Sequence, residues 1–91
     1  MEGTVVLLHG LGRSTRSMAR LEASIAGAGF ETRNLAYRSR CCSIREAAEE
    51  VSAQLGDLRI EHPLIGVTHS MGGVVMRALA SRFNWGGCVM L

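Results

Sequence analysis

Apolar residues along the chain alternate between short continuous runs and stretches with helical spacing. The continuous runs predict strands at residues 4–9, 32–37, 64–67 and 88–91. Between them, apolar positions that recur every three or four residues predict three helices. These positions are Met18, Leu21 and Ile25, then Ile44, Ala47, Ala48, Val51 and Leu55, and finally Val74, Val75, Ala78 and Leu79. This alternation of strands and helices predicts a three-layer α/β sandwich.

Local signals indicate where the helices begin and end. Ser14 or Thr15 can cap the first helix, and Ser43-Ile-Arg-Glu46 matches a capping box at the start of the second. The third helix is expected to run to about Arg82, where the Asn and Gly residues of the stretch 84–87 would end it. A fourth strand would follow at once.

The distribution of polar residues predicts the order of the strands. The first and third strands are apolar on both faces, which is typical of the middle of a parallel sheet. Arg33 and Asn34 place the second strand at an edge. Right-handed crossovers then favour the order 2-1-3-4, in a mainly parallel four-stranded sheet formed by one domain, residues 1–91. Ligands would bind between the carboxyl ends of strands one and three.

A serine lies at the junction between the third strand and the third helix. Ser70 follows the apolar run directly, and Gly72 and Gly73 provide small residues where strand and helix pass close together. This pattern is typical of a nucleophile elbow, although a serine N-cap before a glycine-flanked helix is the alternative. The glycine turn His9–Gly12 lies at the neighbouring carboxyl end, and this convergence favours the elbow.

Two motifs together resemble a known family. Val6-Leu-Leu-His-Gly-Leu-Gly12 and Thr68-His-Ser-Met-Gly-Gly73 resemble the α/β-hydrolase superfamily, in its small bacterial lipase and esterase-like branch. The resemblance implies that Ser70 is the acyl nucleophile and that the backbone N–H groups of Leu11 and Met71 form the oxyanion hole. It implies a small-molecule or lipid ester as substrate and no cofactor. The residues that support the motifs are His9, Gly10, Gly12, His69, Gly72 and Gly73.

The sequence departs from that family at two points. Thr68 occupies the place of the first glycine in G-x-S-x-G, and no Asp, Glu or His follows Ser70, where the family has its acid and base. The acidic residues and the histidine of the stretch 57–62 precede the elbow and enter the opposite end of the strand. We expect neither His9 nor His69 to be the base. The chain therefore resembles the amino-terminal half of a hydrolase, a truncated fold with impaired ester hydrolysis.

Other functions have weaker support in the sequence. A catalytically silent, hydrolase-like domain that acts by association is the main alternative. Gly10-Leu-Gly-Arg-Ser-Thr15 nearly fits a nicotinamide-dinucleotide fingerprint, but Thr15 replaces its third glycine. Arg13 and Arg16 could attract an anionic substrate or simply lie solvated at a helix start. Cys41 and Cys42 have no histidine at ligand spacing, so we expect no metal site.

Composition and charge limit the class of partner and the compartment. All ten positive residues are Arg, they are scattered among acids, and the net charge of +2 argues against nucleic acid. Three cysteines, two of them adjacent, favour a reducing compartment, so we expect a cytoplasmic protein. No transmembrane segment is predicted. The uncharged apolar strand Val89-Met-Leu91 predicts a homo-oligomer joined through that edge.

Overall fold

The computed structural model describes residues 3–40, 43–58 and 63–91. Its four strands form one sheet in the predicted order 2-1-3-4, and each of its three pairings is parallel. In chain order the elements are β1 (Thr4–Leu8), the 3-10 helix η1 (Thr15–Met18), α1 (Ala19–Gly27), β2 (Glu31–Leu35), α2 (Ile44–Leu58), β3 (Leu64–Thr68), α3 (Met71–Ala78) and β4 (Trp85–Met90).

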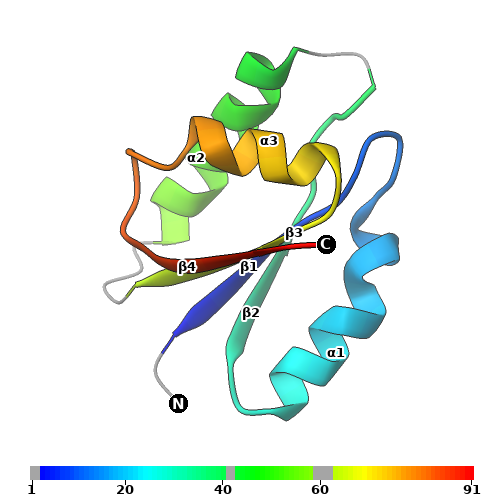
Figure 1. Cartoon of the computed structure of the whole chain (residues 1–91), viewed down its shortest axis with the longest axis vertical. Coiled ribbons are helices and arrows are strands. Elements are labelled where there is room, and N and C mark those ends of the chain that lie inside the picture. Colours follow the sequence, from blue (N-terminus) through cyan, green and yellow to red (C-terminus); the bar gives the residue numbers. More distant parts are fainter. Residues whose placement is uncertain (1–2, 41–42, 59–62) are drawn as a thin grey trace.

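Helices cover the sheet on both faces, which makes the three-layer sandwich (Figure 1). Alternate side chains of β1 enter two separate apolar clusters because successive residues of a strand point to opposite faces. Val5 and Leu7 pack with η1 and α1. Val6 and Leu8 pack with α2 and α3. The central position of β1, predicted from its apolar character, is thus confirmed.

The capping residues predicted for the first two helices are also confirmed. The Ser14 side chain accepts a hydrogen bond from the Arg16 amide at 3.3 Å, and one 3-10 turn then leads into α1. At α2 the capping box is complete: the Glu46 amide donates to Ser43 Oγ at 3.2 Å, and the Ser43 amide donates to Glu46 Oε1 at 3.2 Å. These reciprocal bonds satisfy amides that a helix start leaves without partners.

The predicted end of the third helix is wrong. α3 ends at Ala78, and the chain continues through turns in which the amides of Ala80 and Arg82 donate to carbonyls three residues earlier. β4 accordingly begins at Trp85, three residues before the predicted start, and it includes two glycines. Tertiary contacts explain this: the Trp85 indole donates to the Leu79 carbonyl at 3.1 Å, and the Leu64 amide donates to the Asn84 carbonyl at 2.8 Å. Pairing with β3 overrides the low strand propensity of glycine.

The second strand lies at a sheet edge, as predicted, but it ends earlier than expected. β2 stops at Leu35, so Tyr37 leaves the sheet and its side chain is buried at the carboxyl edge. In the part of the chain that the structure describes, no helix has the length and apolar character needed to cross a membrane.

Candidate functional site

Ser70 has an unusual backbone conformation. It lies between β3 and α3 with φ 54° and ψ −120°, and it is the only residue other than glycine with positive φ among the described residues. Residues that carry a side chain rarely adopt these backbone angles, and backbone strain of this kind is found mostly at functional sites. Although Ser70 occupies the N-cap position, its side chain makes no capping hydrogen bond. An ordinary N-cap has an extended backbone and a bonded side chain, so the N-cap alternative does not describe this serine.

The turn that carries Ser70 presses against the end of β1. A Cβ atom at Gly72 would overlap the Leu8 carbonyl oxygen and would come within 2.9 Å of the His9 carbonyl oxygen. A Cβ atom at Gly10 would come within 2.9 Å of His69 Nδ1 and 3.2 Å of Ser70 Cβ. Gly72 therefore requires glycine, because its Cβ would meet backbone atoms that cannot move aside, whereas the atoms closest to Gly10 belong to the side chains of His69 and Ser70.

Thr68 and Gly73 fit together at the position where the pattern G-x-S-x-G has its first glycine. A Cβ atom at Gly73 would lie 3.2 Å from Thr68 Oγ1, so the absence of a side chain at Gly73 leaves room for the threonine. Thr68 is fully buried at the end of β3. Its branched side chain is thus accommodated beside the first turn of α3.

The loop after β1 is fixed by residues that follow β2. The Tyr37 hydroxyl donates a hydrogen bond to the His9 carbonyl, and the two rings stack with centroids 4.2 Å apart. The Gly12 amide donates to Ser39 Oγ at 2.8 Å. Burial raises the pKa of Tyr37 above its usual value, so the phenol stays protonated and remains a donor. These contacts hold the start and the end of the His9–Gly12 loop.

Tyr37 and Ser39 are functional candidates that sequence reasoning missed. The sequence predicts Tyr37 as the last residue of the second strand, with Ser39 just beyond it. No pattern in the sequence marks either residue, since their partners lie 28 and 27 residues away.

The proposed oxyanion donors lie on the two segments that meet at this edge. Leu11 is in the anchored loop, and Met71 is the first residue of α3. Neither amide donates a hydrogen bond to another described residue, whereas the neighbouring amides of Gly12 and Gly72 do. The Leu11 side chain is exposed, as expected for a residue that would act through its main chain.

The two histidines have different surroundings. His9 is only 1 % exposed, and its Nδ1 lies 3.0 Å from the Gly10 carbonyl oxygen. His69 is exposed, and its amide extends the β1–β3 pairing by donating to the Leu8 carbonyl at 3.1 Å. Ser70 Oγ makes no hydrogen bond to either histidine or to any other described side chain. Of the acidic residues and the histidine that precede the Ser70 turn, Asp57 lies in the last turn of α2, and the stretch 59–62 is outside the described residues.

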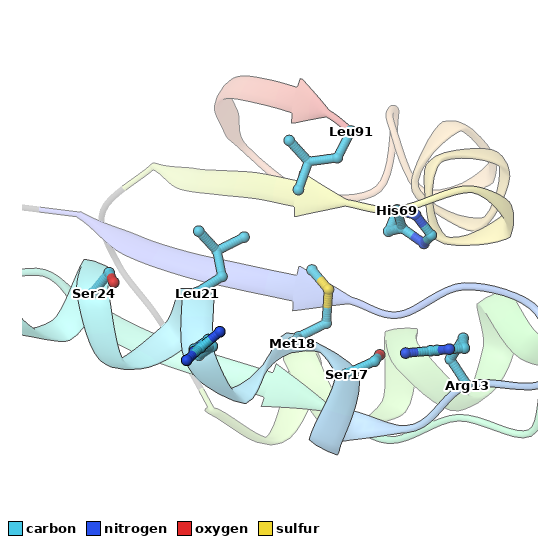
Figure 2. A pocket seen from close by; sticks show the side chains of 8 residues that line it. Arg13, Ser17, Met18, Leu21, Ser24, His69 and Leu91 are labelled. Atoms are coloured by element: carbon cyan, nitrogen blue, oxygen red, sulfur yellow. The ribbon is translucent and has the colours of Figure 1, made fainter.

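Two hollows flank the turn on opposite sides of the sheet. The larger, about 500 Å³, lies on the α1 side, and Figure 2 shows His69 and Leu91 facing Met18 and Leu21 across it. The smaller, about 190 Å³, lies on the α3 side. Its lining residues are Ser70, Gly73, Val74, Arg77 and Met90. Met90, the last residue of β4, and Leu91, which follows it, thus reach different hollows, because successive side chains of an extended chain alternate across a sheet.

Among residues 3–40, 43–58 and 63–91, no group of three or more His, Cys, Asp or Glu side chains could hold a metal ion. The glycine turn also differs from a dinucleotide cradle, since the Gly12 amide is already bonded to Ser39 and a 3-10 turn follows. No protein-family model matches the chain, and no curated protein matches it.

Proposed function

We propose that this chain is a serine acyl hydrolase of the esterase or lipase type, with Ser70 as its nucleophile. The observation that carries the proposal is the strained conformation of Ser70, at φ 54° and ψ −120° on a strand-to-helix turn, with an unbonded side chain. Such a turn exposes the serine oxygen above the sheet and aims the following helix N-terminus at it.

The proposed reaction is acyl transfer to serine followed by hydrolysis. Ser70 Oγ would bond to the carbonyl carbon of a carboxylic ester while the C–O bond to the alcohol breaks, and the alcohol would leave with the serine's proton. Water would then cleave the acyl-serine and release the carboxylic acid. The amides of Leu11 and Met71 would donate to the carbonyl oxygen as it becomes negative, which is the largest catalytic effect in many such enzymes.

Because no described base contacts Ser70 Oγ, we expect slow reaction. An oxyanion hole without a working base leaves catalysis of roughly a thousandfold over water. The test is labelling with a fluorophosphonate probe and mapping of the modified peptide by mass spectrometry. The parent chain and Ser81→Ala, which changes an exposed serine beyond α3, should be labelled slowly at Ser70. Equal labelling of Ser70→Ala would refute the assignment.

A second candidate function is association without catalysis, which the exposed edge of the sheet favours. Val89, Met90 and Leu91 are 52 %, 56 % and 62 % exposed, and within the described residues β4 pairs only with β3. Edges of this kind invite pairing with another chain, and a two-fold operator closes the assembly. The proposed assembly is a homo-oligomer joined through β4.

Sedimentation of the parent chain and of Val89→Lys tests this assembly. The parent should sediment as a dimer or larger species, and the charged variant as a monomer or insoluble protein. A parent chain that stays a stable monomer at tens of micromolar, a concentration well above the dissociation constant of a specific dimer, contradicts this assembly.

We also propose a cytoplasmic location, which the free thiol of Cys88 supports; Cys41 and Cys42 lie outside the described residues.

A further inference from the structure

The larger hollow combines an apolar floor with a cationic rim. Met18, Leu21 and Leu91 supply the apolar surface, and Arg13 and Arg20 supply the positive charge. The remaining lining residues are Ser17, Ser24 and His69, so none of the eight side chains is acidic. With a volume of about 500 Å³, the hollow falls within the usual range of small-molecule sites.

No acidic side chain of the described residues forms a salt bridge with the arginines of this rim. Residues 3–21 contain three arginines, Arg13, Arg16 and Arg20, and no Asp or Glu. The next acid, Glu22, accepts hydrogen bonds from Thr32 and Asn34 instead. Within the described part of the chain, salt bridges hold Arg33, Arg38 and Arg82 but none of the three arginines of η1, α1 and the preceding loop.

The same cationic character extends along the carboxyl edge of the sheet. Arg13 also lines a hollow of about 290 Å³ beside Gly12, which it shares with Arg38 and Arg40. On the α3 side, Arg77 lines the hollow that contains Ser70. Positive groups thus surround the turn from both faces of the sheet, a distribution that raises the local concentration of anionic ligands.

The larger hollow reaches the residue that precedes the proposed nucleophile. His69, which lines it, is the residue immediately before Ser70, and Gly10 lies against both of them. Ser70 itself lines the smaller hollow on the α3 side, so an aliphatic chain of a ligand bonded at Ser70 would have to pass His69 at the carboxyl edge of the sheet to reach the larger hollow. The arginines lie along the same hollow, where a charged group on that ligand could reach them.

We propose that this hollow binds an anionic amphiphile, with an aliphatic chain on Met18, Leu21 and Leu91 and a carboxylate or phosphate held by Arg13 and Arg20. If this ligand is the substrate, which rests on the proposed hydrolase function, the substrate is an ester that carries both an aliphatic chain and an anionic group. Arginine suits this role because its planar group donates paired hydrogen bonds to such oxyanions.

Calorimetric titration of the Ser70→Ala chain with three monomeric octyl compounds tests the binding without turnover. Octyl phosphate should bind about tenfold more tightly than octyl glucoside, because charge-assisted hydrogen bonds contribute more than neutral ones. Octyltrimethylammonium should bind most weakly. Equal affinity for the phosphate and the glucoside would overturn the proposal.

Matched arginine variants identify the residues that bind the anion. Arg13→Gln and Arg20→Gln should each weaken octyl phosphate binding by roughly fivefold and leave octyl glucoside binding unchanged. Arg45→Gln is the control, because Arg45 is exposed on α2, on the opposite face of the sheet. An unchanged affinity in both Arg13→Gln and Arg20→Gln would show that these arginines are only a solvated helix start.

Vesicles distinguish a free amphiphile from a membrane surface. Binding to vesicles of anionic lipid without binding to monomeric octyl phosphate would overturn the proposal in favour of a membrane-contact patch. The tests of anion binding and of the hydrolase function can fail independently. Labelling of Ser70 without octyl phosphate binding would refute only the proposed substrate class, and octyl phosphate binding without labelling would refute only Ser70 as the nucleophile.

Discussion

The loop after β1 and the turn after β3 meet at the same edge of the sheet, but they are held in opposite ways. The loop is fixed by side chains that reach it from beyond β2, namely the hydroxyls of Tyr37 and Ser39. The turn is fixed by the absence of side chains at Gly10 and Gly72, which lets backbone approach backbone. A substitution that removes one hydroxyl therefore loosens the loop by a single hydrogen bond, whereas a side chain added at the turn forces the two segments apart.

The largest expected effect is at the turn. Gly72→Val should lower the free energy of unfolding by more than about 2 kcal/mol, because the new side chain would overlap the end of β1. The measurement is urea unfolding followed by the fluorescence of Trp85, the only tryptophan. Gly87→Val is the control, since a Cβ atom there meets nothing within 4 Å, and it should change stability by less than about 0.5 kcal/mol. Equal losses at the two sites would mean that the turn is not closely packed.

A smaller effect is expected where the loop loses its buried hydrogen bond. Tyr37→Phe keeps the ring against His9 but leaves the His9 carbonyl without its donor, at a cost of about 1–2 kcal/mol. The rate of Ser70 labelling should fall as well, because the loop that carries Leu11 is less firmly placed. An unchanged labelling rate, with reduced stability, would make Tyr37 a purely structural residue.

Ser39→Ala should lower the free energy of unfolding less than Tyr37→Phe, so its effect on the rate of Ser70 labelling is easier to interpret. It removes one acceptor from the Gly12 amide, which costs about 1 kcal/mol or less. We expect slower labelling of Ser70, with recovery in Ser39→Thr, which restores the hydroxyl. Ser81→Ala is the control and should match the parent in both measurements. Labelling of Ser39→Ala at the parent rate would show that the loop does not need this contact.

The smallest effect is a dependence of stability on alkaline pH. Burial raises the pKa of Tyr37 in the folded chain above its unfolded value of about 10. Because the unfolded chain loses this proton first, the contribution to stability is complete below about pH 10 and is lost as pH rises through the folded pKa. Tyr37 is the only tyrosine, so its phenolate absorbance reports the pKa directly. A folded chain that titrates at or below the value found in urea would contradict the buried position.

The same contrast explains what the sequence could predict. Strand order followed from which runs are apolar on both faces, and the Ser70 turn followed from a serine between a strand and two glycines. Both are local patterns. The contacts of Tyr37 and Ser39 join segments 27 or 28 residues apart, and no spacing in the sequence relates them to the loop that they hold.

The carboxyl-terminal boundaries failed for a related reason. Glycines 86 and 87 predicted an ending, yet they lie inside β4 because β3 provides a pairing partner. Likewise α3 ends at Ala78, before the apolar pattern does, and Leu79 is buried from the turn that follows. Tertiary pairing decided these boundaries, and local propensity did not.

The most direct measurement of the central claim is a crystal structure of the chain after reaction with a phosphonate probe. We expect phosphorus bonded to Ser70 Oγ and a phosphonyl oxygen about 2.7–3.1 Å from the amide nitrogens of both Leu11 and Met71. An adduct whose phosphonyl oxygen points to solvent, away from these two amides, would contradict the oxyanion hole. An adduct on another residue would contradict Ser70 as the nucleophile.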